Sequence, residues 1–148
     1  MQTALTLETF LSLLLAVALG AIVGVEREKS HKPAGLRTHM LVSLGACLFT
    51  MMSTSFGAQP AQVAGGIVAG IGFIGAGTIW AEKDKVQGIT TAASLWTTAA
   101  IGLTVGIGDY PLAVVVTLLV LIILASNSVL RRIGLEKNRA PIASAKVP

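Results

Sequence analysis

Residues 70–96 read GIGFIGAGTIWAEKDKVQGITTAASLW, and this stretch decides the fold. Its first part is apolar and dense in glycine, a short charged segment follows at 82–85, and a run of small and hydroxyl residues leads into a second apolar stretch. The pattern is typical of two membrane-spanning helices joined by a tight polar hairpin. Glycine allows close helix contacts in a membrane, but it also suits loops that bind phosphate. The choice between these two uses of glycine largely determines the predicted function.

The glycines in this stretch match a nucleotide-binding pattern only superficially. Gly70, Gly72 and Gly75 spell GxGxxG, but the dinucleotide fingerprint needs a preceding strand, a following amphipathic helix and an acidic residue about 20 positions later. Here the preceding apolar run has helix length, and position 90 is a threonine. The sequence therefore favours close helix packing over nucleotide binding. The glycines expected to pack helices are Gly20, Gly24, Gly66, Gly70, Gly72, Gly75 and Gly77.

The composition points to a membrane protein. The chain has 148 residues, of which 53% are hydrophobic and 12% are charged, whereas a soluble domain usually has about 25% charged residues. A bilayer span needs roughly 20 apolar residues. We therefore predict an all-α bundle of five transmembrane helices, near residues 7–25, 36–55, 61–80, 91–107 and 112–130. One transmembrane domain covers residues 1–130, and a basic cytoplasmic tail follows at 131–148.

The basic residues predict the orientation of this bundle. All 11 lysines and arginines lie in or beside the first connection, in the third connection or in the tail, which share one side of a five-span arrangement. The positive-inside rule then places the N-terminus outside and the C-terminus in the cytoplasm. The net charge of +4 is thus explained by topology and does not indicate a nucleic-acid partner. We interpret the first apolar run as a retained span rather than a cleaved signal.

Small residues predict which helices touch. Ser12, Ala16, Gly20 and Gly24 form a ridge along the first span, and small residues mark close helix contacts in membranes. We expect the first, third and fourth spans to be in tight mutual contact, the second to be intermediate and the fifth to face lipid at the periphery. The wide glycine faces also predict a homodimer.

The charged ends of the first four spans form the candidate functional surface. Glu26 and Glu82 could hold a hard cation such as Mg²⁺, which takes one or two carboxylates and keeps several waters. Arg27 and Arg37 could instead neutralise these acids as structural ion pairs, and His39 could be a proton sensor or a hydrogen-bonded anchor. We expect a hydroxyl stripe along the Thr90 face. The predicted cytoplasmic-face cluster comprises Glu26, Arg27, Lys32, Arg37, His39, Glu82, Asp84, Thr90, Thr91, Ser94 and Trp96.

Charged side chains are missing from the middle third of every predicted span. Ion-coupled transporters usually have ionisable residues there, so the pattern argues against a transport function. A pore lined by backbone and hydroxyl groups remains open as an alternative. The chain also shows no pairing of a nucleophile with a base, and we expect neither an enzyme nor any cofactor other than Mg²⁺.

Three segments resemble a known family. They are similar to motifs of the bacterial MgtC/SapB membrane family. The first motif is GAIVGVERE at 20–28 with HKPAGLRTHMLVSLGACLF at 31–49, the second is GIGFIGAGTIW at 70–80, and the third is GITTAASLWTTAAIGLTVGIG at 88–108. The match extends over about residues 15–130. This resemblance implies an inner-membrane protein of Mg²⁺ homeostasis, associated with virulence in relatives. It also implies a regulator of other membrane complexes, such as the ATP synthase, and an ion transporter or channel is the alternative.

The resemblance also implies site residues, motif by motif. Larger members continue into a soluble C-terminal domain, whereas this chain ends shortly after its last predicted span, and some virulence-associated members have asparagine at the position of Thr90. The residues that match the family motifs are Glu26, Arg27, Lys32, Gly35, Arg37 and His39, then Gly72, Gly75, Gly77 and Glu82, and then Thr90, Thr91, Ala92, Ser94 and Trp96.

Overall fold

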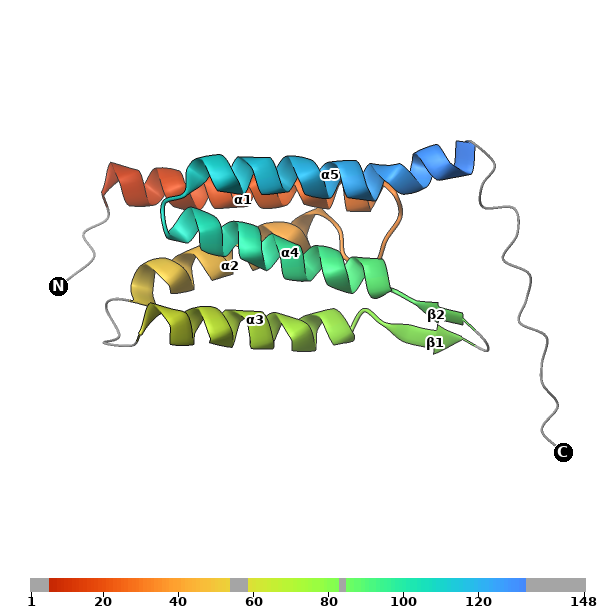
Figure 1. Cartoon of the computed structure of the whole chain (residues 1–148), viewed down its shortest axis with the longest axis horizontal. Helices are drawn as coiled ribbons and strands as arrows, with labels where there is room; N and C mark the ends of the chain where they lie inside the picture. Colours follow the sequence, from red (N-terminus) through yellow and green to blue (C-terminus); the bar gives the residue numbers. More distant parts are fainter. Residues whose placement is uncertain (1–5, 54–58, 83–84, 133–148) are drawn as a thin grey trace, which may run out of the picture.

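The structure, a computed structural model, describes residues 6–53, 59–82 and 85–132. Within this part of the chain five helices follow one another and alternate in direction (Figure 1). A two-stranded antiparallel hairpin joins the third helix to the fourth. The elements are α1 (Leu7–Lys29), α2 (Leu36–Met52), α3 (Pro60–Ala76), β1 (Trp80–Glu82), β2 (Lys85–Gln87), α4 (Ile89–Gly106) and α5 (Tyr110–Arg132).

The predicted helical architecture is confirmed for these residues, with a difference at the hairpin. The third helix ends at Ala76, and Trp80, expected at the end of that helix, begins β1. The hydroxyl of Thr78 donates to the carbonyl of Gly75 at 2.8 Å, which helps to close the helix. Gly88 then starts α4 from the left-handed region at φ 87°. By length and composition, α1 with 23 residues and α4 with 18 could cross a membrane, whereas α2 and α3 have 17 each.

The helices form layers with α2 and α4 in the middle. In Figure 1, α1 and α5 lie along one side of this pair and α3 lies along the other, next to the hairpin. Helix α1 packs closely against α2, where a Cβ added at Gly20 would lie 2.6 Å from the carbonyl oxygen of His39. At Gly102 an added Cβ would overlap the backbone of Ser43. The glycines of α1 and α4 therefore let both helices approach α2.

The predicted arrangement of helices is wrong in one respect, because α2 takes the central place that we expected for α3. Cβ atoms added at Gly66, Gly70 and Gly72 of α3 would meet no atom within 4 Å, so the expected packing role of these glycines is not found in the described residues. Gly75 makes ordinary contact with Ala92, at 3.4 Å from the added Cβ, and Gly77 is close only to carbonyls of its own helix end. Gly20 and Gly24 do lie against α2, since Cβ atoms added there would lie 2.6 Å from His39 and 2.7 Å from Leu36.

The core lies mainly between α1, α2, α4 and α5. Val23, Cys47, Ile101 and Val105 are fully buried there. From α5, a single stripe joins this core, and the other side chains along the helix up to residue 126 are mostly exposed. This outer position of α5 agrees with the sequence-based expectation. The stripe consists of Ala113, Thr117, Val120 and Leu124.

Candidate functional site

The polar residues of the bundle gather where α1 ends and α2 begins. Helix α1 ends at Lys29, and its last turn closes with the amide of Ser30 donating to the carbonyl of Glu26 at 3.0 Å. His31 has a positive φ of 52°, a conformation frequent just after a helix C-terminus. The chain then reverses, and the amide of Leu36 donates to Oε2 of Glu28 at 2.7 Å. This carboxylate satisfies one of the free amides at the start of α2.

Arg27 points into the bundle although it lies in the last turn of α1. Its side chain is buried, and Nη2 donates to the hydroxyl of Thr91 on α4 at 2.9 Å. Nη1 lies 3.8 Å from Oε2 of Glu26, at the outer limit of an ion pair. The other carboxylate oxygen of Glu26 accepts from the hydroxyl of Ser30 at 2.8 Å. Arg27 thus links α1 to α4 and partly compensates the charge of Glu26.

His39 makes the corresponding link from α2. It is fully buried, with Nδ1 2.9 Å from the carbonyl of Gly35 and Nε2 3.2 Å from the hydroxyl of Ser94. Because a carbonyl can only accept, Nδ1 must be protonated in the first bond. The Ser94 hydroxyl also lies 2.8 Å from the carbonyl of Thr91, to which it donates. A hydroxyl has one proton, so a neutral His39 competes with that carbonyl for the proton of Ser94.

Three buried polar atoms in this region have no hydrogen-bond partner among the residues that the structure describes: Oε2 of Glu26, Nε of Arg27 and Oγ of Ser43. Ser43 lies one turn after His39 on α2, between Gly20 and Gly102. Ser43 is not among the site residues predicted from the sequence. Its spacing of four from His39 is the signal that could have identified it, because residues four apart share a helix face.

The comparisons with known proteins agree with this arrangement of motifs. A model of the MgtC family matches residues 13–133. The chain belongs to the MgtC family. It is 43% identical over 135 residues to Protein MgtC of Salmonella typhimurium (strain 14028s), covering 90% of this chain and 57% of that protein. It is 41% identical over 130 residues to a protein of Escherichia coli (strain K12) named as the putative magnesium transporter YhiD, covering 79% of this chain and 60% of the relative. No solved structure matches the chain.

This MgtC-family chain therefore spans less than two thirds of the length of these relatives, 57% and 60% respectively. The family segment includes α1 from Leu13 onward and continues to the end of α5. All the residues of the polar cluster lie within it.

The structure brings together five of the predicted site residues of this family member, namely Glu26, Arg27, His39, Thr91 and Ser94. Lys32, Arg37, Thr90 and Trp96 are exposed and do not take part in these bonds. The expected Thr90 face therefore differs from the observed one, because α4 turns Thr91, Ser94 and Thr98 inward. Asp84 lies outside the described residues, as does the side chain of Glu82.

The predicted magnesium site of Glu26 and Glu82 stays a prediction, because the side chain of Glu82 lies outside the described residues. Within the described part of the chain, no three His, Cys, Asp or Glu side chains come together in a way that could hold a metal ion. Of the two expected ligands, Glu26 is hydrogen-bonded to Ser30 and faces Arg27. Mg²⁺ prefers several oxygen ligands in octahedral geometry, so Glu26 alone does not make such a site. Instead, the arrangement ties α1, α2 and α4 together at one end.

Proposed function

We propose that this chain is an integral protein of the bacterial inner membrane with a regulatory or accessory role in Mg²⁺ homeostasis, and that it does not itself carry the ion. The observation that supports this most directly is the close packing of α1 and α4 against α2. Gly24 of α1 and Gly106 of α4 leave space for no more than a hydrogen atom, since added Cβ atoms would lie 2.7 Å from Leu36 Cα and from Thr50 Cβ.

The distribution of buried polar groups on α4 supports the same proposal. Thr91, Ser94 and Thr98 are buried near its start, and the buried residues after them are Ala99, Ile101, Gly102 and Val105. The hydroxyl of Thr98 donates to the carbonyl of Ser94 at 2.8 Å, so it is satisfied within its own helix. A conducting path needs polar groups that continue through the membrane, whereas these groups end in an apolar core.

The arrangement of the charges supports five spans with the N-terminus outside and the C-terminus in the cytoplasm. The α1–α2 connection, the hairpin and the end of α5 lie at one end of the bundle (Figure 1). The end of α2, the start of α3 and the α4–α5 connection lie at the other. Lys29, Lys32, Arg37 and Lys85 are exposed at the first end, which is the cytoplasmic end by the positive-inside rule.

A transport function is the second candidate, and specific observations favour it. One relative is named a putative magnesium transporter. In addition, Oε2 of Glu26 and Oγ of Ser43 are buried without partners, and unsatisfied oxygens of this kind can bind a cation or water. The partners proposed with the regulatory role are a second copy of the chain and another membrane complex, such as the ATP synthase.

Flux measurements on the purified full chain separate the two candidates. We expect liposomes that contain the protein and an internal Mg²⁺ indicator to fill no faster than empty liposomes. Robust flux that is lost in Glu26→Gln or Glu82→Gln would overturn the regulatory proposal in favour of transport. Flux unaffected by either substitution would equally contradict the regulatory proposal, because it would show that another path carries the ion.

Growth at low Mg²⁺ tests the role of the cluster in a strain that lacks the protein. We expect the wild type to restore growth and Ser94→Ala to restore it less, because this change removes the hydroxyl that faces His39. Lys29→Gln is the matched control, since Lys29 is exposed at the same end of the bundle. Membrane abundance measured by immunoblot shows whether each variant is made. Equal growth of all three at equal abundance would contradict a role for the cluster.

A further inference from the structure

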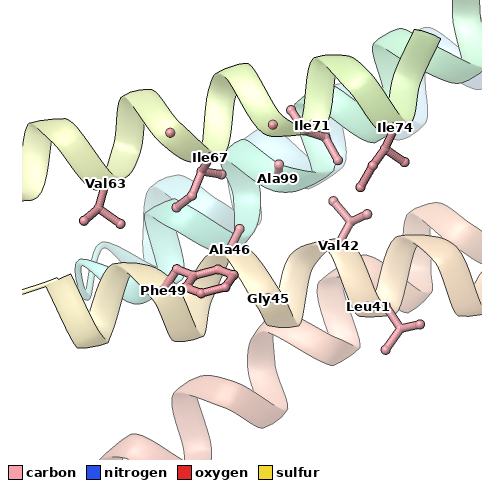
Figure 2. Close-up of a pocket in the computed structure, with 12 residues that line it drawn as sticks. Leu41, Val42, Gly45, Ala46, Phe49, Val63, Ile67, Ile71, Ile74 and Ala99 are labelled. Carbon is pink, nitrogen blue, oxygen red and sulfur yellow. The ribbon is translucent and has the colours of Figure 1, made fainter. Parts of the chain in front are cut away.

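An apolar groove runs between α2 and α3 with α4 as its floor. Its volume is about 560 Å³, within the range of roughly 300–1,000 Å³ that is usual for small-molecule sites. Figure 2 shows Val63 and Phe49 toward one end and Ile74 and Leu41 toward the other, so the groove is elongated along the helices. The twelve lining residues are all hydrophobic or glycine. Such a surface offers water no partners, and its natural occupant is a hydrocarbon chain.

Glycine keeps this groove open. Gly45 of α2 and Gly66 and Gly70 of α3 line it, and Cβ atoms added at these positions would meet nothing within 4 Å. Each glycine in a helix costs about 1 kcal/mol relative to alanine. Here no contact within the described chain offsets that cost, in contrast to Gly20 and Gly102, which allow close contact with α2.

A cation lies on the same row of α2 as the groove. Leu41, Gly45 and Phe49 line the groove at intervals of four residues, and Arg37 continues this row by one turn toward the charged end. Side chains on a helix tilt toward its N-terminus, so Arg37 projects beyond the end of the apolar lining. Arg37 is exposed, and no ion pair or hydrogen bond of its side chain is found among the described residues.

The start of α2 adds to this preference for an anion. Its first turn has no acidic residue, and its N-cap, Gly35, provides no side-chain hydrogen bond. Helix N-termini attract anions through their free amides and dipole. Glu28 already accepts from the amide of Leu36, and the guanidinium of Arg37, one residue further along α2, is exposed beside it.

We propose that the groove is a binding site for one anionic phospholipid of the cytoplasmic leaflet, with an acyl chain between α2 and α3 and its phosphate at Arg37. The proposal depends on the membrane orientation given above but not on the regulatory role. The groove and the cation fit a phospholipid together, because an elongated apolar surface leads toward Arg37, whose side chain has no ion pair with any described residue. A zwitterionic lipid would fill the groove equally well, but its phosphate would bind Arg37 less strongly. The positive charge of its own headgroup competes with Arg37 for that phosphate.

Native mass spectrometry of the full chain, released from nanodiscs that contain equal amounts of phosphatidylglycerol and phosphatidylcholine, tests the proposal. We expect one phosphatidylglycerol to stay bound to the wild type. Arg37→Gln should reduce this retention about tenfold, the effect of losing one charge-assisted hydrogen bond. Lys29→Gln, which removes an exposed cation away from this row, should leave retention unchanged.

The groove itself is tested by filling it. We expect Gly70→Leu to displace the lipid, whereas Gly65→Leu should not, because Gly65 is on the same helix with equally open surroundings but does not line the groove. Circular dichroism and gel filtration confirm that each variant is folded.

Equal retention of both lipids, or equal loss in Gly70→Leu and Gly65→Leu, would overturn the proposal. So would a chain–chain crosslink along α3 that Gly70→Leu abolishes, because a second copy would then occupy the groove. Mg²⁺ flux is measured on the same samples. Lipid retention tests the groove and flux tests the regulatory role, so failure of one proposal can be told from failure of the other.

Discussion

Arg27 follows Glu26 directly on α1, yet its guanidinium lies inside the bundle against Thr91 of α4. Its aliphatic stem and charged head are both buried, which is rare for arginine. The sequence singled out Arg27, His39, Thr91 and Ser94, but it also singled out Thr90, which is exposed. Neighbouring threonines on a helix point about 100° apart, and both faces of α4 carry small and hydroxyl residues. Periodicity alone could not decide which face meets α2.

The two neighbouring threonines provide a matched test of this burial. We expect Thr91→Val to lower the free energy of unfolding by about 1–2 kcal/mol, because it leaves Nη2 of Arg27 without its acceptor while keeping the side-chain shape. Thr90→Val, one position away and exposed, should change it by less than about 0.5 kcal/mol. Unfolding by increasing fractions of sodium dodecyl sulfate in mixed micelles measures both. Equal losses would show that the Arg27–Thr91 bond contributes nothing specific.

Among the elements, α3 departs most from its prediction. Its glycines indicated the tightest packing in the chain, whereas the structure places α3 at the edge, in contact mainly with α4. Glycine density shows where another surface can approach, but it does not identify that surface. The hydrophobic pattern did predict the existence and order of the helices. It did not predict strands β1 and β2, nor the close approach of Gly88 to Thr78, where an added Cβ would overlap the carbonyl.

Alanine substitutions on α4 and α3 should therefore have opposite effects. At Gly102 an added methyl overlaps the backbone of Ser43, and we expect Gly102→Ala to destabilise the protein by about 1–3 kcal/mol, as overpacking does. Gly72→Ala meets open space and should be neutral or stabilising by up to about 1 kcal/mol through helix propensity. The same detergent titration compares them. A loss of stability at Gly72 as large as that at Gly102 would show that α3 is packed on both faces.

For the molecule as a whole, the distribution of charge gave the best guidance. The alternating helix directions in Figure 1 are compatible with placing the lysines and arginines on one side, and the membrane topology itself stays a prediction. The positive-inside rule relates the charges near the ends of spans to the two sides of the membrane. The orientation can therefore be predicted without knowing which helices pack together. Which helices pack against one another depends on contacts between residues far apart in the chain. The sequence of this one chain did not indicate that α2 would take the central place.

Cysteine accessibility tests the orientation of the whole chain. In a Cys47→Ser background, which removes the buried native thiol, we expect Gln59→Cys to react with a membrane-impermeant maleimide in intact spheroplasts. Lys32→Cys, exposed at the opposite end, should react only after the membrane is permeabilised. Both positions are exposed, so a difference in labelling reports the side of the membrane. The reverse pattern would show that the orientation is inverted.

The link between Arg27 and Thr91 has a consequence for how the protein is made. Helices α1 and α2 are consecutive and can pair as soon as both have left the ribosome, but Thr91 lies 64 residues after Arg27. At a synthesis rate of about 5–20 residues per second, this gap corresponds to roughly 3–13 s. During that interval a cation destined for the protein interior has no hydroxyl partner. The arrival of α4 therefore completes this link, and truncation before residue 91 leaves the charge of Arg27 for the insertion machinery or the lipid headgroups to accommodate.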